Sequence, residues 1–274
     1  MDNLNEQAEQ TNRALWDEIA PVHFKAYQEV EILRSGGIAL DELELAAIGD
    51  VTGKTLLHLQ CHIGTDTLSW ARQGALVTGV DFSVESLAYA RQLAQELDLQ
   101  ATFVQSNIYD LPAGLDGQFD IVYTSRGVLC WLRDLDEWAR IIAHFLKPGG
   151  IFYIMESHPI TYIFEEKQPG ELAIFNRYFH QPQPTLWDEP FPDYADGGYI
   201  PRNFSYEWEW SLSDIFNALL KAGLVIESFN EYERIFHKLF PGMQEGPRGW
   251  YTYPQFAGKL PLIFTLKASK PGAS

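Results

Sequence analysis

Residues 55–83 read TLLHLQCHIGTDTLSWARQGALVTGVDFS. The run 56–59 is short and rich in leucine, which is typical of a buried parallel strand. Gly64 then opens a segment with the apolar spacing of a helix, and 75–80 is a second apolar run that ends at Asp81. A strand, a tight turn, a helix and a second strand in this order predict an open α/β sheet.

Asp81 is the residue on which the functional interpretation rests. Ligands of open α/β sheets bind beyond the carboxyl ends of the strands. A carboxylate at the end of the second strand can accept hydrogen bonds from both hydroxyl groups of a ribose. The sequence therefore predicts that a nucleoside-bearing cofactor binds at this edge of the sheet.

Two further segments continue the alternation of strands and helices. Residues 119–123, FDIVY, read as a strand, and the apolar spacing of 135–145 predicts a helix. The turn Lys-Pro-Gly-Gly at 147–150 leads into a strand at 151–155. Proline ends the helix, and the glycine pair supplies the positive φ that lets the chain reverse.

The C-terminal part resumes this pattern after a long excursion. Apolar spacing predicts a helix at 211–222, capped by a serine at 211 or 213 and ended by the glycine that follows it. Residues 224–229 and 262–266 read as two more strands. The chain thus returns to the same sheet near its end.

This arrangement resembles the class I S-adenosylmethionine (SAM) dependent methyltransferases. Their first motif is an apolar run, an acid, an apolar residue and then G-x-G-x-G, and many carry the Phe-Asp pair and the Lys-Pro-Gly-Gly turn seen here. The resemblance is close from 54 to 159, and CHIGTDTL, GVDFS and ESHP are similar to a bacterial subgroup of small methyltransferases. It implies an α/β, Rossmann-like sheet of seven mostly parallel strands in the order 3-2-1-4-5-7-6, with strand seven antiparallel and helices on both faces.

The first motif departs from the family pattern at three positions. His58 stands where the acid is expected, and Gln60 and His62 replace the first two glycines, so that only Gly64 remains. Glycine permits a positive φ and close approach of a ligand to the backbone. We expect Gln60 and His62 to place side chains against the methionine part of the cofactor, and His58 to be a hydrogen-bonded core residue.

The resemblance implies SAM as the cofactor and S-adenosylhomocysteine (SAH) as the product. Asp81 would bind the ribose, Phe82 would flank the adenine, and Asn107 with Ile108 would meet the adenine edge. Ser83 is also expected among the cofactor-binding residues. Asn107 is alternatively a turn residue. The methionine end is expected near the following residues: Gln60, Cys61, His62, Gly64, Ser125 and Arg126.

Methyl transfer depends mainly on holding the acceptor near the methyl group. Arg126 is expected to pair with the SAM carboxylate or with an acidic acceptor, and a surface ion pair is the alternative. If the acceptor is a hydroxyl, a thiol or a protonated amine, a general base assists, and His158 is the first choice. Glu156 is the second choice. A histidine hydrogen-bonded in a loop is the alternative for His158.

Aromatic residues outside the core predict the acceptor site. The chain divides into a helical lid (1–45), a SAM-binding core (46–158), an inserted substrate cap (159–205) and the remainder of the core sheet (206–274). The side chains expected at the acceptor are Trp16, Tyr27, Trp131 and Tyr199. An amphipathic helix packed on the core, a dimer surface at the insertion, and a core position for Trp131 are the alternatives.

Composition limits the partners. The chain has 20 basic and 37 acidic residues, a net charge of −17, and this charge disfavours a nucleic-acid substrate. Cys61 and Cys130 are too few for a disulfide framework or a metal site, and the polar, acidic N-terminus does not read as a signal peptide. We expect a cytoplasmic monomer or homodimer without a membrane segment that acts on a small molecule.

Two other functional classes are considered. A nicotinamide-dependent dehydrogenase also uses a glycine turn and an acid after the second strand, but its G-x-G-x-x-G is absent from 60–65. A catalytically silent protein that binds SAM, a nucleoside or a protein partner is the stronger alternative because two glycines are lost. Titration with SAM and SAH distinguishes it from an enzyme only if neither binds.

Overall fold

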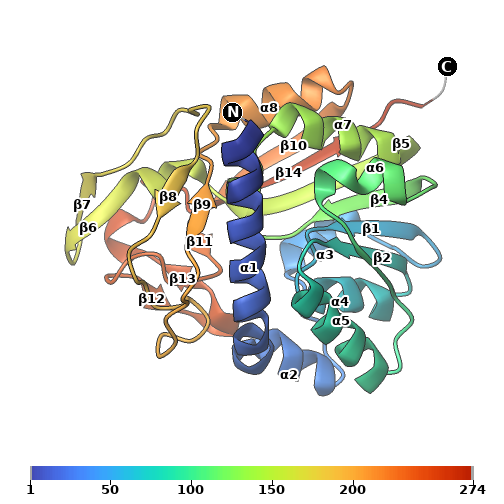
Figure 1. The fold of residues 1–274 in the computed structure, drawn as a ribbon, viewed down its shortest axis with the longest axis horizontal. Helices are drawn as coiled ribbons and strands as arrows, with labels where there is room; N and C mark the ends of the chain where they lie inside the picture. The colour runs from blue at the N-terminus through green and yellow to red at the C-terminus, as the bar shows by residue number, and fades with distance from the viewer. Residues whose placement is uncertain (1, 273–274) are drawn as a thin grey trace.

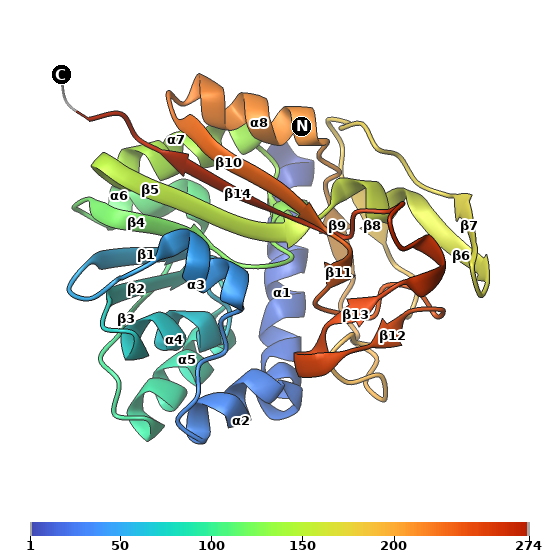
Figure 2. The same ribbon diagram turned by 180° about the vertical axis from the view of Figure 1, so that it is seen from behind.

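The computed structural model describes residues 2–272, and its centre is a single seven-stranded sheet with the order β10-β14-β5-β4-β1-β2-β3 (Figures 1 and 2). Strand β14 is antiparallel to both of its neighbours, and the other strands are parallel to one another. The predicted strand order and the antiparallel seventh strand are confirmed. The strands are β1 (Thr55–Leu59), β2 (Leu76–Asp81), β3 (Thr102–Gln105), β4 (Phe119–Thr124), β5 (Leu146–Ser157), β10 (Val225–Tyr232) and β14 (Ile263–Ser269).

Helices cover both faces of the sheet because side chains of successive strand residues point to opposite sides. On one face Val122 packs with Trp138 of α7, and on the other face Ile121 packs with Trp70 of α4. Both tryptophans are completely buried. The helices are α3 (Glu42–Ile48), α4 (Thr65–Arg72), α5 (Val84–Glu96), α6 (Leu111–Gly114), α7 (Leu135–Phe145) and α8 (Leu212–Lys221).

The predicted Lys-Pro-Gly-Gly segment reverses the chain with a positive φ at only the first of its two glycines. Gly149 has φ +79°, and its N–H donates to the carbonyl of Lys270 at 2.8 Å. A side chain at Gly150 would lie 2.9 Å from the Lys147 carbonyl, so this position requires glycine. Strand β5 runs through this turn and is therefore longer than the predicted 151–155. Ser211 caps α8 in a reciprocal hydrogen-bonded pair with Asp214, which decides between the two candidate caps.

The N-terminal segment forms α1 (Asp2–Ala26) and α2 (Gln28–Arg34) before the chain breaks at the two glycines 36–37. Figures 1 and 2 show α1 standing at one end of the sheet, between the core helices and the excursions. No helix within residues 2–272 is both long enough and apolar enough to cross a bilayer.

Two excursions face α1 from the far side. The first contains the antiparallel pair β6 (Phe164–Gln168) and β7 (Glu171–Ile174), and the pair β8 (Thr185–Trp187) and β9 (Ser205–Glu207). The second lies between β10 and β14 and forms a small sheet of β11 (Arg234–Ile235), β13 (Tyr251–Thr252) and β12 (Gln244–Glu245). No functional role was predicted for this second excursion.

Candidate active site

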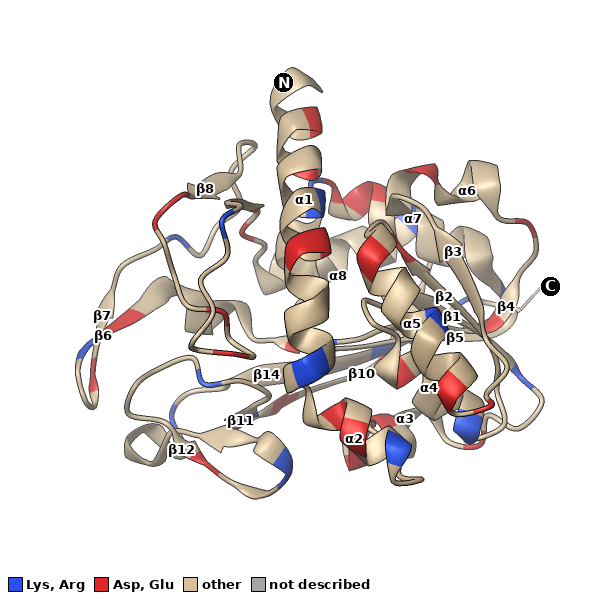
Figure 3. Cartoon of the chain, turned by 60° about the horizontal axis from the view of Figure 1, so that its bottom comes forward, with Lys and Arg blue, Asp and Glu red and all other residues tan. Residues whose placement is uncertain are grey.

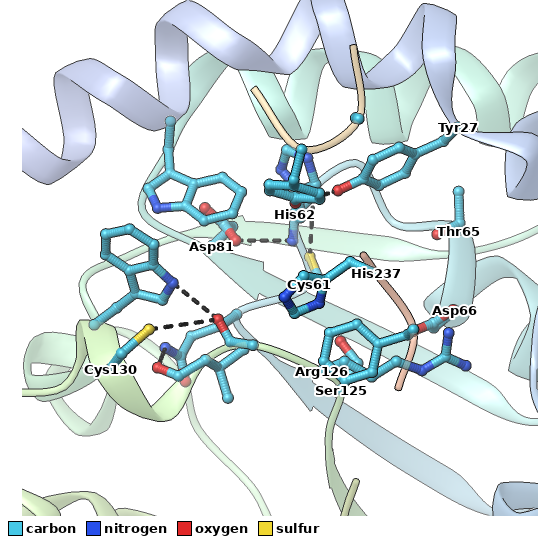
Figure 4. A pocket seen from close by; sticks show the side chains of 18 of the residues that line it. Tyr27, Cys61, His62, Thr65, Asp66, Asp81, Ser125, Arg126, Cys130 and His237 are labelled. Atoms are coloured by element: carbon cyan, nitrogen blue, oxygen red, sulfur yellow. Dashed lines mark hydrogen bonds between the residues drawn. The ribbon is translucent and has the colours of Figure 1, made fainter. Parts of the chain in front are cut away.

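A cavity of about 590 Å³ lies beyond the carboxyl ends of β1, β2 and β4, which is the position where open α/β sheets bind ligands. Its volume is typical of a small-molecule site. Residues of α1 and of both excursions complete its walls. Predicted site residues that line it are Trp16, Tyr27, Gln60, Cys61, His62, Asp81, Phe82, Asn107, Ile108, Ser125, Arg126 and Trp131 (Figure 4).

Asp81 ends β2 with its carboxylate at the cavity. Its Oδ2 accepts the backbone N–H of His62 at 2.8 Å, and its Oδ1 accepts the backbone N–H of Ser83 at 2.9 Å. Burial raises the pKa of Asp81 to about 6, and the two backbone N–H groups work against this rise. Because each carboxylate oxygen has a second lone pair, the group can still bind two hydroxyls.

The turn at 60–64, which we call the motif turn, has the positive φ values typical of glycine. Two of the three residues that adopt them are not glycine. Gln60 has φ +57°, His62 has φ +49° and Gly64 has φ +76°. Side chains in this left-handed region cost roughly 1 kcal/mol or more each. Gly64 itself is required for packing, because a Cβ there would lie 2.9 Å from Cβ of Ala90.

Gln60 carries a buried polar atom without a partner. Its Nε2 lies 3.4 Å from the carbonyl of Val128, and its Oε1 has no hydrogen bond within the described residues. A buried carbonyl oxygen without a donor is costly unless a ligand supplies one. The amino group of the methionine part of SAM is a donor of the required kind, so this turn fits the cofactor.

His58 is a core residue, as expected. Its Nδ1 lies 2.7 Å from Oγ1 of Thr67, and its Nε2 lies 3.0 Å from Oγ of Ser125. Burial lowers the pKa of His58 to about 3, so the ring is neutral. The imidazole thus links the first turn of α4 to the residue after β4. It does so from the strand position at which the family pattern has an acid.

Asn107 acts as a turn residue while it also lines the cavity. Its Oδ1 accepts the backbone N–H of Tyr109 at 3.1 Å, and its Nδ2 donates to Glu9 of α1 at 2.9 Å. The side chain is therefore already bonded on both sides. Its predicted contacts with the adenine edge would compete with these bonds.

Arg126 lies in a buried charge cluster rather than on the surface. Its Nη2 lies 2.9 Å from Glu44, and its guanidinium lies over the rings of Phe236 and Trp250 at 5.9 and 5.5 Å. Asp66 of α4 lines the same part of the cavity (Figure 4). Burial raises the pKa of Asp66 to about 7, and Arg126 limits the rise.

Several predicted site residues lie outside the cavity wall. Ser83 instead caps α5 and donates to Asp17 of α1 at 2.7 Å. The Tyr199 hydroxyl donates to Glu18 of α1 at 2.8 Å, so it joins the first excursion to α1. Gly64 is the N-terminal cap of α4. These three residues hold the site together without facing its interior.

The two predicted catalytic residues are also not among the residues that line the cavity. The Glu156 carboxylate accepts backbone N–H groups of Gly127, Val128 and Leu129 at 2.8, 2.7 and 3.1 Å. His158 accepts the backbone N–H of Ile160 at 3.1 Å, and its Nε2 lies 2.9 Å from Glu231. Both side chains are used within the fold, which corrects their predicted placement at the acceptor.

Three segments distant in sequence meet through a chain of hydrogen bonds that we call the histidine latch. Ser86 lies 2.9 Å from His62 Nδ1, His62 Nε2 lies 2.9 Å from His23 Nδ1, and His23 Nε2 lies 2.9 Å from Asp193. The latch joins the motif turn to α1 and to the first excursion. Burial, then His23, lowers the pKa of His62 well below its usual value.

Other cavity residues were missed by the sequence analysis. They come mainly from the second excursion and include Phe236, His237, Lys238, Arg248, Trp250 and Tyr251, with Cys130, Tyr194 and Glu207 from elsewhere. The richness of 236–258 in rings, glycine and proline was the available signal. That composition alone does not show which wall the segment covers.

Comparison with known proteins agrees with this architecture. Residues 57–154 match the family described as "Methyltransferase domain". The ubiquinone biosynthesis O-methyltransferase of Escherichia coli is 35% identical over 127 residues, which cover 46% of this chain and 50% of the relative. The chain thus spans about half the length of the curated relatives it matches.

Solved structures share the fold over most of the chain. A SAM-dependent methyltransferase from Mesorhizobium loti has a TM-score of 0.57 at 21% identity and covers 86% of this chain and 99% of its own. The [4+2]-cyclase SpnF has a TM-score of 0.58 at 18% identity, with 97% of both chains covered. The sheet order, the acid that ends β2 and the matched domain together show that the chain contains a methyltransferase domain with the fold of the class I SAM-dependent methyltransferases.

Proposed function

We propose that this protein transfers a methyl group from SAM to a small-molecule acceptor held in the cavity. The observation that carries the proposal is Asp81, whose carboxylate lies at the cavity with hydrogen-bonding capacity left over. SAM supplies an activated methyl group, so the protein has mainly to bind and orient both molecules.

The chain's own residues have distinct parts in this proposal. Asp81 would hold the ribose hydroxyls, Phe82 and Ile108 would flank the adenine, and Oε1 of Gln60 would accept from the amino group of the methionine part. Arg126 already forms an ion pair with Glu44 through one of its nitrogens before any ligand binds. It remains available to a carboxylate through Nε, which has no partner within residues 2–272.

The peripheral segments would close the site. In this proposal 1–45 is a lid and 159–205 a substrate cap on a SAM-binding core of 46–158 and 206–274, with Met1 and residues 273–274 outside the described part. Trp16 of α1 lies edge-on to Trp131 at 5.3 Å and to His62 at 4.9 Å, which supports a lid over the cofactor. Closure of such segments excludes water from the reaction.

Charge and neighbours support a small acceptor. Acidic positions are spread along α1, α2 and α5 around the site, and the net charge is −17 (Figure 3). A polyanionic nucleic acid would be repelled by such a surface. The name of the E. coli relative, an O-methyltransferase, favours an oxygen as the attacked atom. The unpaired thiols of Cys61 and Cys130 support a reducing cytoplasm as the location.

Calorimetry with SAM and SAH tests the proposal directly. We expect both to bind the purified protein, and Asp81→Ala to weaken binding by about 100-fold because two charge-assisted hydrogen bonds are lost. Asp116→Ala serves as the control, because Asp116 is exposed and does not line the cavity. Undiminished binding by a folded Asp81→Ala variant would refute the cofactor assignment.

A catalytically silent SAM-binding protein is the second candidate. The lost glycines at 60 and 62 favour it, and the cyclase SpnF shows that this fold is not restricted to proteins named as methyltransferases. Incubation with radiolabelled SAM and a metabolite extract separates the two. Labelled small-molecule product supports the enzyme, whereas binding without any product supports the silent protein.

A further inference from the structure

His237 is a cavity residue for which the cofactor contacts give no use. It follows β11 by two residues and lines the cavity from the second excursion. Figure 4 shows its imidazole reaching into the space beside Cys61, on the side toward Ser125 and Arg126. The side chain thus lies where the carboxyl ends of β1 and β4 meet the acceptor part of the cavity.

The ring of His237 is neutral and has no hydrogen-bond or charged partner within residues 2–272. Burial alone lowers the pKa of His237 to about 4, with no contribution from a hydrogen bond or a charge. The ring is therefore neutral at pH 7 and has a free lone pair. His58 and His62, in contrast, have hydrogen-bond partners at both ring nitrogens.

The segment that carries His237 is anchored by neighbouring residues. Arg234, at the start of β11, lies 2.8 Å from Asp41 and stacks over Trp250 at 4.3 Å. Phe236 packs against the apolar cluster that contains Trp250. A general base has to be held in this way to stay within reach of a proton.

Aromatic rings surround the space in front of this imidazole. Tyr194 of the first excursion lies 6.1 Å from His237, and Phe236 lies 5.1 Å from it. Trp250 and Tyr162 line the same cavity. Such walls favour a planar acceptor, since ring pairs with centroids 4.5–7 Å apart attract each other.

We propose that His237 is the general base that removes the proton from an aromatic hydroxyl group of the acceptor. The inference rests on the proposed function and names its acceptor class. The imidazole nitrogen takes the hydroxyl proton, and the oxygen forms the new bond to the methyl carbon. The carbon–sulfur bond breaks with its electron pair on sulfur, which leaves SAH and the methyl ether.

Asp66 is another titratable group that lines this cavity, and it is less suited to the role. Burial raises the pKa of Asp66 to about 7, but its carboxylate already interacts with Arg126 and Tyr123. The acceptor oxygen would have to displace these partners. His237 has no such partner within residues 2–272, and a negatively charged oxygen that forms beside its ring favours the protonated imidazole.

Binding of two matched probes to the SAH-loaded protein is the first test. 4-Nitrophenol has the hydroxyl, and 4-nitroanisole carries a methyl ether in its place. We expect the wild type to prefer 4-nitrophenol by about tenfold, the effect of one hydrogen bond, and His237→Leu to bind both equally. No preference in the wild type, or an unchanged preference in the variant, overturns the inference.

Transfer of a radiolabelled methyl group from SAM to 4-nitrophenol is the second test. We expect His237→Gln and His237→Asn to form 4-nitroanisole about 100-fold more slowly than the wild type. His144→Gln, an exposed position on α7, should match the wild type. No product from the wild type overturns the acceptor class, and equal rates overturn the base.

Calorimetry with SAH separates this inference from the proposed function. Normal SAH affinity in the His237 variants shows that the cofactor site and the fold are intact, so any loss then concerns the acceptor. Failure of the wild type to bind SAH would instead contradict the proposed function. Of His237→Gln and His237→Asn, the variant that retains SAH affinity is the one whose methyl-transfer rate tests the inference.

Discussion

At the scale of the residue, buried polar side chains are fixed by backbone groups of neighbouring turns. Asp81 accepts two backbone N–H groups, and Glu156 accepts four, including that of Ser157. These carboxylates look alike in sequence as acids at strand ends. They differ in surroundings, because Asp81 lines the cavity and Glu156 bonds to the turn after β4.

The pKa of Asp81 makes cofactor binding depend on pH. Since burial raises this pKa to about 6, the carboxylate is charged at pH 7 and becomes protonated below pH 6. A protonated acid loses acceptor capacity toward the ribose, so the affinity for SAH should fall by up to about tenfold per pH unit below pH 6. Calorimetric titration between pH 5 and pH 8 checks this, and a constant affinity would contradict it.

Glu156→Gln should destabilise the fold. The amide places an NH₂ group among backbone donors, and each buried N–H left without an acceptor costs about 1–3 kcal/mol. Urea unfolding should show a free energy lower by about that amount, and the turn at 127–129 should loosen around Trp131. Glu171→Gln, at an exposed position on β7, is the control and should leave the unfolding curve unchanged.

At the scale of the element, α1 is held to the core and to the first excursion by specific contacts. The histidine latch joins it to both, and Glu18 accepts from Tyr199, Arg202 and Asn203. Although burial opposes the charge, these hydrogen bonds keep the pKa of Glu18 at about 2. Opening α1 therefore breaks several polar contacts together.

The histidine latch should open in mild acid. The pKa of His62 lies well below its usual value of 6.5 in the closed form, so the open form binds a proton more readily. The closed form thus loses stability as pH falls below about 6.5, by up to a factor of about ten per pH unit. Hydrogen exchange of α1, corrected for intrinsic rates, should rise between pH 7 and pH 5.5.

Replacing His62 tests this interpretation of the latch. His62→Gln keeps a hydrogen-bonding side chain that does not titrate in this range, so the acid-dependent part of the α1 exchange should disappear. Exchange in α7, none of whose residues belongs to the latch, serves as the internal reference. An α1 response that persists in the variant would assign the pH effect to another group.

At the scale of the whole molecule, the sheet order brings four separate regions to one cavity. Strands β1 and β4 are neighbours, so Cys61 and Arg126 come together after them, and α1 and both excursions close the space in front. The apolar clusters on the two faces of the sheet fix this arrangement. Ligand binding should therefore stabilise the molecule as one unit.

Thermal unfolding measures this coupling. SAH at 100 times its dissociation constant should add about 2.7 kcal/mol to the free energy of unfolding. In a domain of this size, each kcal/mol raises the melting temperature by roughly 2–4 °C. We therefore expect a rise of several degrees. Asp81→Ala should show almost no rise at the same concentration, and a full rise in that variant would contradict the proposed site.

Much of the fold could be predicted because local patterns and family order agree. The apolar runs, the Ser211 cap and the turn at Gly149 each have a local physical cause, and the structure confirms them. The excursion at 159–205 was predicted only as a loop. Its paired strands β6–β9 are short, and their partners are not evident from local spacing.

The same distinction between local patterns and packing of distant segments applies to the site. The sequence by itself determined the sheet, the acid at the end of β2 and the positions after β1 and β4, because these follow from residues close together in the chain. Only the tertiary structure decided that His158 and Glu156 face the fold, and that His237 faces the cavity. Which way a loop side chain points depends on packing between distant segments, and the local sequence does not contain that information.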